Sequence, residues 1–144
     1  MDNKPRQLMQ LARVFPDKLV SKLQKKTHTE DYINHSVITQ RLLQVCGPFD
    51  WDIEVIFGPE SKPIAVKGTL GIEIDGKKVT VSEIGTDQNN AGKDDGDIIK
   101  EMASDALKRA GLRIGCGTHL WAQDQYFLFA QLLKIHDMTA EDVG

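Results

Sequence analysis

Residues 97–121 read DIIKEMASDALKRAGLRIGCGTHLW and predict a long helix followed by a glycine-rich turn. Ala103, Ala106, Ala110 and Ile114 recur at steps of three or four residues, so they share one face of this helix. The alanines on that face are small. We therefore expect the helix backbone to lie very close to a neighbouring sheet.

The charged residues of this helix are sorted along its length, with acidic residues near the start and basic residues near the end. They are Asp97, Glu101, Asp105, Lys108, Arg109 and Arg113. This order complements the helix dipole, and Asp105 and Arg109 are spaced so that they can pair. One interpretation is a solvated, self-paired helix face. The other is a cationic helix end that holds phosphates.

Two segments upstream alternate apolar and polar residues with a period of two, which is typical of strands. They are WDIEVIF, residues 51–57, and IAVKGTLGIEI, residues 64–74. Asp75-Gly76 predicts a hairpin turn, and Val79 and Val81 begin a return strand. The sequence therefore predicts an α+β fold. Its core is a three-stranded antiparallel meander packed against the long helix, with N-terminal helices and a C-terminal helix around it.

The flanking segments predict further helices. A short helix ends at Pro16, and Leu19, Val20 and Leu23 continue its apolar face beneath several lysines. A second amphipathic helix runs from Tyr32 to Cys46. Residues 85–96 predict a mobile loop in which the aspartates cap the next helix; calcium binding is the alternative. After residue 121 we expect a closing helix or a contact with a neighbouring subunit, and then a frayed acidic tail.

Several segments resemble the Rad-fifty-two superfamily of single-strand annealing proteins. The segment 104–110, SDALKRA, is followed by Gly115 and by Leu120-Trp121, in the order of that family's signature helix. Upstream, Tyr32-Ile33, Val37-Ile38 and the segment 47–51 resemble its first helix and the entry into its sheet. The likeness spans residues 32–121. It divides the chain into a basic helical arm at 1–31, an annealing core at 32–133 and an acidic tail at 134–144.

The resemblance implies a DNA-binding protein that needs no cofactor and performs no bond chemistry. In that superfamily the lysine and arginine of the signature helix grip the DNA backbone, which assigns strand binding to Lys108 and Arg109. The further candidates are Arg113 after them, Lys25 and Lys26 ahead of the first helix, and Lys67, Lys77 and Lys78 on the hairpin. For the three hairpin lysines, protection of a strand edge is the alternative role.

The resemblance also implies partners. Family members form closed rings, so single-stranded DNA and other copies of the chain are the expected partners. Whether a recombinase or a single-strand-binding protein also binds stays open. The chain is short for the family's eukaryotic mediator, which fits a bacterial or phage protein or an excised core domain.

Composition is compatible with this interpretation. The net charge is -3, which argues against a uniformly basic nucleic-acid binder. The charge is unevenly distributed, because residues 1–26 hold seven Lys or Arg against two Asp. The two cysteines are too few for a disulfide framework, and no apolar run is long enough to span a membrane. We expect a cytoplasmic protein of a bacterial or phage-infected nucleoid, with a mitochondrial or nuclear location as alternatives.

Two other functions remain open. A helix, three antiparallel strands and a helix is also the order of a double-stranded RNA-binding module. Asp52, Asp75 and Lys77 loosely suggest a metal-dependent nuclease, although Asp-Gly at a hairpin tip is ordinary turn chemistry. Because no nucleophile is paired with a base, we expect no enzyme.

Overall fold

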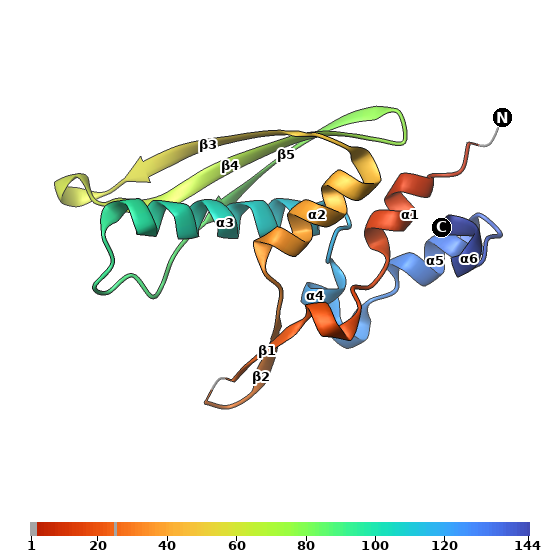
Figure 1. Ribbon diagram of the computed structural model, residues 1–144, viewed down its shortest axis with the longest axis horizontal. Helices are drawn as coiled ribbons and strands as arrows, with labels where there is room; N and C mark the ends of the chain where they lie inside the picture. Colours follow the sequence, from red (N-terminus) through yellow and green to blue (C-terminus); the bar gives the residue numbers. More distant parts are fainter. Residues whose placement is uncertain (1–2, 25) are drawn as a thin grey trace.

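The computed structural model describes residues 3–24 and 26–144, apart from the side chain of Leu23. Its regular elements follow one another along the chain as shown in Figure 1. The helices are α1 (Arg6–Ala12), α2 (His35–Cys46), α3 (Asp95–Arg113), α4 (His119–Ala122), α5 (Leu128–Ile135) and α6 (Ala140–Val143). The strands are β1 (Ser21–Gln24), β2 (Thr29–Tyr32), β3 (Asp50–Phe57), β4 (Pro63–Ile74) and β5 (Lys77–Gly85). Short 3-10 turns occupy Asp17–Leu19, Pro59–Ser61 and Gln123–Gln125.

The core is the predicted antiparallel sheet, in the order β3-β4-β5, packed against α3. Trp51 pairs with Leu70 and Leu70 with Val81, so these three residues share the face that α3 covers. The turn between β4 and β5 is Asp75-Gly76, and both residues have positive φ, 51° and 80°. Positive φ at both central residues is the geometry of a tight hairpin turn. The predicted α+β fold is therefore confirmed.

Helix α3 lies against the sheet with its backbone almost touching β5. Ala106 and Ala110 are fully buried in this contact. A Cβ added to Gly85 would lie 2.0 Å from the Met102 carbonyl oxygen and 2.5 Å from the Ala106 nitrogen. Only glycine fits there, and only a small-faced helix can approach so closely. The expectation of a close helix–sheet contact is confirmed.

Helix α1 is held at both of its ends by side chains from other elements. The Asp75 carboxylate, in the β4–β5 turn, accepts from the backbone N–H groups of Gln7 at 2.9 Å and Leu8 at 3.1 Å. Arg41, on α2, donates to the carbonyl oxygens of Gln10, Leu11 and Arg13. A carboxylate at the start and a guanidinium at the end both complement the helix dipole. These bonds tie the N-terminal region to the sheet and to α2.

The predicted helix over residues 19–26 is wrong. After a 3-10 turn the chain enters β1, which pairs antiparallel with β2 in the register Ser21–Tyr32. Tyr32 therefore lies in a strand, and α2 begins only at His35, where the Asn34 side chain caps it by accepting from the Ser36 N–H at 2.9 Å. The pattern of lysines between apolar residues fits a helix. Pairing with residues 29–32 instead provides hydrogen-bond partners for the backbone N–H and C=O groups, so the segment forms a hairpin. In Figure 1 this hairpin lies on the side of α3 away from the sheet.

The expectation of a frayed C-terminal tail is also wrong. Thr139 and Asp142 form a capping box that starts α6, in which each side chain bonds the other's backbone N–H. Met138 and Val143 are buried in a cluster with Met9 of α1. The predicted closing helix is present as α5, which contacts α1. In the described part of the chain, no helix is both long and apolar enough to cross a membrane.

Candidate nucleic-acid interface

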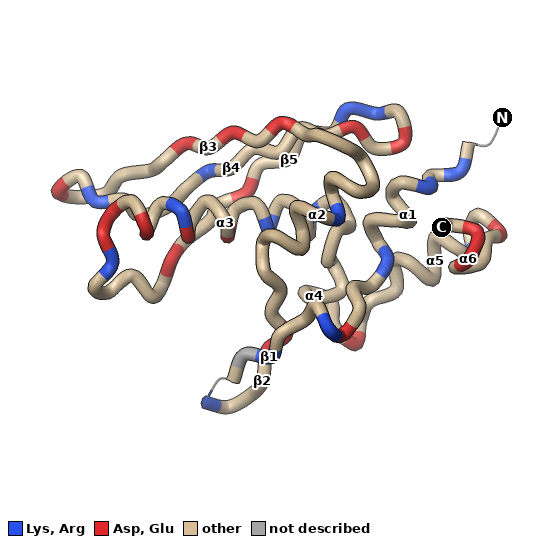
Figure 2. Tube along the Cα trace, in the orientation of Figure 1, with Lys and Arg blue, Asp and Glu red and all other residues tan. Residues whose placement is uncertain are grey.

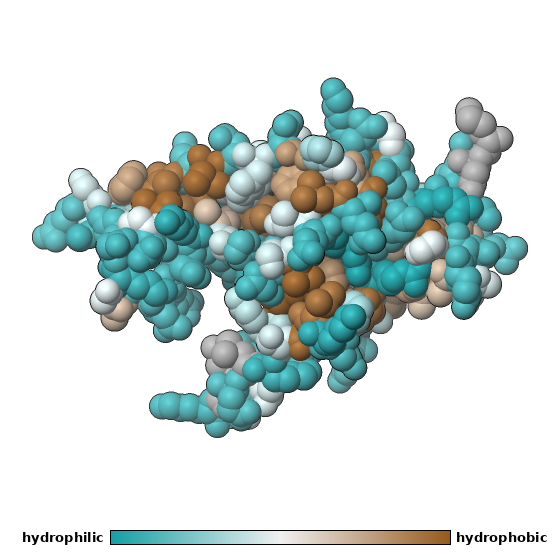
Figure 3. Space-filling model, in the orientation of Figure 1, coloured by the Kyte–Doolittle hydropathy of each residue, from teal (hydrophilic) through white to brown (hydrophobic). Residues whose placement is uncertain are grey.

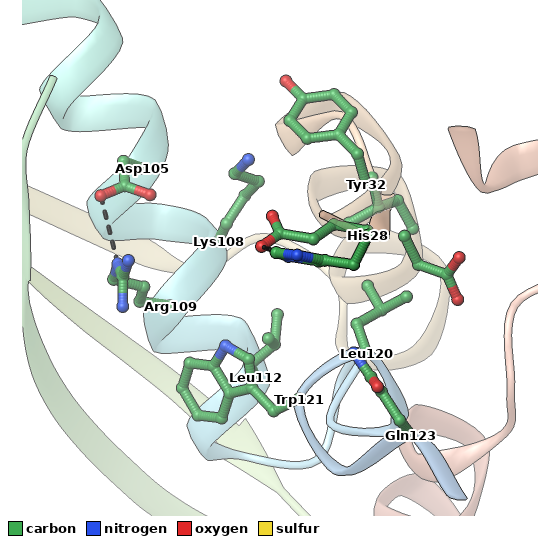
Figure 4. A pocket seen from close by; sticks show the side chains of 12 residues that line it. His28, Tyr32, Asp105, Lys108, Arg109, Leu112, Leu120, Trp121 and Gln123 are labelled. Carbon is green, nitrogen blue, oxygen red and sulfur yellow. Dashed lines mark hydrogen bonds and ion pairs between the residues drawn. The ribbon is translucent and has the colours of Figure 1, made fainter. Parts of the chain in front are cut away.

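A groove runs between the β1–β2 hairpin, the C-terminal half of α3 and α4 (Figure 4). It has a volume of about 390 Å³. Helix α3 contributes Asp105, Lys108, Arg109 and Leu112, which lie on one side of the helix because each follows or precedes two others by three or four residues. Its lining from the other elements is His28, Glu30, Asp31, Tyr32, Ile33, Leu120, Trp121 and Gln123. Both predicted backbone-gripping residues, Lys108 and Arg109, are thus brought into one groove.

Lys108 reaches across the groove to Tyr32. Its ammonium nitrogen lies 4.3 Å from the centre of the Tyr32 ring, a cation–π contact. Partial burial lowers the pKa of Lys108 from its ordinary value, while the carboxylate of Asp105 acts in the opposite direction. Among the described residues Lys108 forms no ion pair. Its charge is therefore not neutralised by a bonded carboxylate.

Arg109 is more exposed and is oriented by its own helix. Its Nε donates to Asp105 Oδ2 at 3.1 Å, the pairing expected from their spacing. Asp105 Oδ2 also accepts from the Thr86 N–H at 3.0 Å, which fixes the carboxylate. The two terminal amino groups of Arg109 form no hydrogen bond within the described part of the chain. Such a planar pair of donors can bind a phosphate.

The groove also contains three carboxylates, so it is not uniformly cationic. Each has a partner. Asp105 pairs with Arg109, Asp31 pairs with Lys22, and Glu30 lies 2.9 Å from the His28 ring nitrogen. Figure 2 shows that basic and acidic residues are scattered over the whole described chain, and β3, for example, carries only acidic ones. Anion binding here depends on a few placed cations and not on a strongly positive surface.

Two exposed aromatic side chains line the same groove. Tyr32 is 41% exposed and Trp121 is 43% exposed. In Figure 4 they lie on opposite sides of it, with Lys108 near the Tyr32 ring and Leu112 beside Trp121. Trp121 is also covered by the guanidinium of Arg113, 5.0 Å from the ring centre. The groove therefore combines cations with open aromatic faces.

The other predicted site residues are distributed around the molecule. Arg113 forms an ion pair with Glu83 of β5 at 2.7 Å and reaches the groove only through Trp121. Lys26 is exposed at the tip of the β1–β2 hairpin, two residues before His28. Lys25 lies outside the described residues. Of the described residues in this set, Lys26 lies next to the hairpin wall of the groove, and Arg113 contacts the groove through Trp121.

The three lysines of the sheet are not brought to the groove. Lys67 pairs with Glu54 and Ile84 on the face of the sheet opposite α3. Lys77 and Lys78 begin β5 beside the turn at Asp75, and Lys77 shares a separate hollow with Arg113. A DNA strand that lies in the groove could reach these lysines only if it also wrapped around the molecule.

The two candidate nuclease carboxylates lie far apart. Asp52 pairs with Thr69, six residues before Asp75 on β4, which corresponds to about 20 Å along a strand. The Asp75 carboxylate is already bonded to the start of α1. Across residues 3–24 and 26–144, no group of three or more His, Cys, Asp or Glu side chains is placed to hold a metal ion.

Two features of the groove were not predicted from the sequence. The hairpin side of the groove, lined by residues 28 and 30–33, was predicted as the end of a helical arm and the start of the next helix, and Trp121 was noted only as part of the family resemblance. Thr27 and Thr29, which are β-branched and close together, were the available signal for a hairpin. Nothing in the sequence indicated that Trp121 would face Tyr32 across a groove.

No protein-family model matches the chain, and no curated protein matches its sequence.

Proposed function

We propose that this protein binds single-stranded DNA in the groove and promotes the pairing of complementary strands without ATP. The observation that carries the proposal is the placement of Lys108 and Arg109 side by side on the solvent-facing side of α3, both lining one groove. Cations that hold the sugar–phosphate backbone leave the hydrogen-bonding edges of the bases free. A strand held in this way can find its complement.

The proposed assembly is a ring of identical subunits. In the described sheet β3 and β5 each have one unpaired edge. Beside the β3 edge, Ile53, Phe57 and Ile64 are exposed by 39%, 58% and 53%, and Figure 3 shows apolar surface over this end of the sheet. Unpaired edges next to exposed apolar residues favour association between copies. This supports joining of sheets between neighbouring subunits.

The start of α3 argues against duplex RNA as the ligand. A double-stranded RNA-binding module would present basic residues and open backbone N–H groups there. Here Asp94 caps the helix by accepting from the Asp97 N–H at 2.8 Å, and Asp95 lies in the same turn. These carboxylates repel phosphate at the position where the dipole would attract it.

The proposal is tested by comparing labelled ligands of equal length. We expect the purified protein to shift single-stranded DNA at lower concentration than duplex RNA. It should also accelerate pairing of complementary oligonucleotides in the absence of ATP, and electron microscopy should show closed rings. Stronger binding to duplex RNA would replace the proposal by the RNA-binding module. Binding without accelerated pairing would reduce it to single-strand binding.

A further inference from the structure

Each aromatic side chain of the groove is covered on one side by a cation from α3. Lys108 lies 4.3 Å from the centre of the Tyr32 ring, and Arg113 lies 5.0 Å from the centre of the Trp121 ring. Cations over aromatic faces stabilise the orientation of the rings. Two rings from different elements, β2 and α4, are thus held at the groove in the same manner.

The two rings remain exposed on opposite sides of one groove, whereas some other aromatic side chains of the molecule are packed inside it. Phe15 is only 3% exposed, and the second tryptophan, Trp51, packs over Gly68, where an added Cβ would lie 2.2 Å from its ring. Trp121, in contrast, is 43% exposed on the one-turn helix α4. Large apolar rings lose favourable free energy when they stay in water. Their exposure in one groove indicates a surface that a ligand covers.

The geometry points to Tyr32 and Trp121 as stacking platforms for unpaired bases. This inference rests on the proposed function and specifies how the groove selects its ligand. Aromatic rings stack on the face of any base, so the contact needs no particular sequence. Stacking uses the face of the base and leaves its pairing edge free. In a duplex both faces of an internal base are covered by neighbouring bases, so the platforms favour single strands.

An abasic oligonucleotide separates base contacts from backbone contacts. It keeps the phosphates that Lys108 and Arg109 would hold and lacks the bases that Tyr32 and Trp121 would stack. We expect the wild-type protein to bind it about 5- to 100-fold more weakly than ordinary single-stranded DNA of the same length. Because this comparison uses the unmodified chain, it does not depend on the folding of any variant.

Replacement of Trp121 assigns the effect to one side chain. Trp121→Leu should weaken binding of ordinary single-stranded DNA about 5- to 100-fold and leave binding of the abasic oligonucleotide unchanged. Trp121→Phe keeps a ring and should retain most of the affinity. Phe127, which is 71% exposed at the start of α5 and does not line the groove, provides the control. Phe127→Leu should bind both oligonucleotides as the wild type does.

Fluorescence gives a second readout, because the chain has only two tryptophans. Stacking of a base on Trp121 should quench the emission of the wild type when ordinary single-stranded DNA is added, and Trp121→Phe should abolish this quenching. Equal affinity for ordinary and abasic strands, with no quenching, would overturn the inference and leave the proposed function standing. Failure to bind either oligonucleotide would instead overturn the proposed function itself.

Discussion

Replacement of both Lys108 and Arg109 by alanine measures what the groove cations contribute to strand binding. Arg109 has two amino groups that bond to none of the described residues, and Lys108 has no bonded carboxylate, so each can form a charge-assisted bond to phosphate. Such bonds contribute about 1.5–3 kcal/mol each, and we use about 1–2.5 because the groove is open to water. The double variant should therefore lose about 2–5 kcal/mol of binding free energy, a rise in Kd of about 30- to 4,000-fold.

The salt dependence gives the same prediction in a second form. On a single strand, each neutralised phosphate contributes about 0.7 to the slope of log K against log salt concentration. Loss of two contacts should make that slope less steep by about 1.4. Fluorescence anisotropy of a labelled oligonucleotide, repeated from low to moderate salt, measures both quantities. The wild-type affinity itself should fall steeply over this range.

The fold should survive the double substitution. Both side chains lie off the buried face of α3, and an exposed ion pair together with a cation–π contact contributes only about 1 kcal/mol to stability. The matched control removes two adjacent lysines that do not line the groove, at the β4–β5 hairpin: Lys77→Ala with Lys78→Ala. The affinity of this control for single-stranded DNA should stay within about threefold of the wild-type affinity, because salt screens charges that lie outside the groove. Unchanged binding by the groove variant, or equal losses in both variants, would refute the assignment of the groove.

Three further predictions concern the scaffold. Gly85→Ala should lower the free energy of unfolding, measured by urea denaturation, by about 3 kcal/mol because the new Cβ would meet the backbone of Met102. Gly71→Ala is the control and should change this free energy little, because its Cβ would have only ordinary contacts. Arg41→Ala should lower the free energy of unfolding, measured by thermal denaturation, by about 2–3 kcal/mol because it removes the donors at the end of α1. Arg41→Lys should lose less of this stability. Full stability of the alanine variant would contradict the capping role. Burial lowers the pKa of His119, so below about pH 6.5 this residue binds more protons in the unfolded chain than in the folded one. The free energy of unfolding measured by urea denaturation should therefore fall as the pH drops from 7 to 5. His119→Phe should flatten that dependence.

The sheet and its covering helix could be predicted from the sequence because both follow from local patterns. Alternating apolar residues define β3 and β4, and Asp75-Gly76 defines the turn between β4 and β5. The alanines of α3 indicated a close contact with the sheet, and Gly85 provides the space for it. Each of these signals is contained within a few residues.

The structure of the misassigned segments depends on contacts with residues outside each segment. Residues 19–24 have an amphipathic pattern that fits a helix, and only the pairing of residues 21–24 with residues 29–32 makes that part a strand. The C-terminal residues look too polar to fold, yet Met138 and Val143 are buried against Met9 of α1. Strand pairing decided the structure in the first place and a tertiary contact decided it in the second.

The candidate site could be predicted only in part, for the same reason. Lys108 and Arg109 are neighbours in the sequence, so any structure that exposes that face of α3 keeps them together. Tyr32 lies far from them in the sequence and reaches Lys108 only because the β1–β2 hairpin folds over the outer side of α3. Trp121 joins the groove through the turn that follows α3, at Gly115 and Gly117, whose φ angles are 99° and 87°.

Strand annealing is the most direct test of the proposed function. Two complementary oligonucleotides, one with a fluorophore and the other with a quencher, are mixed with the protein in the absence of ATP. The wild type should accelerate the loss of fluorescence over the spontaneous rate, and the variant with Lys108→Ala and Arg109→Ala should return to the spontaneous rate while it remains folded. Pairing at the spontaneous rate with the wild type, or full acceleration by the folded double variant, would contradict the account.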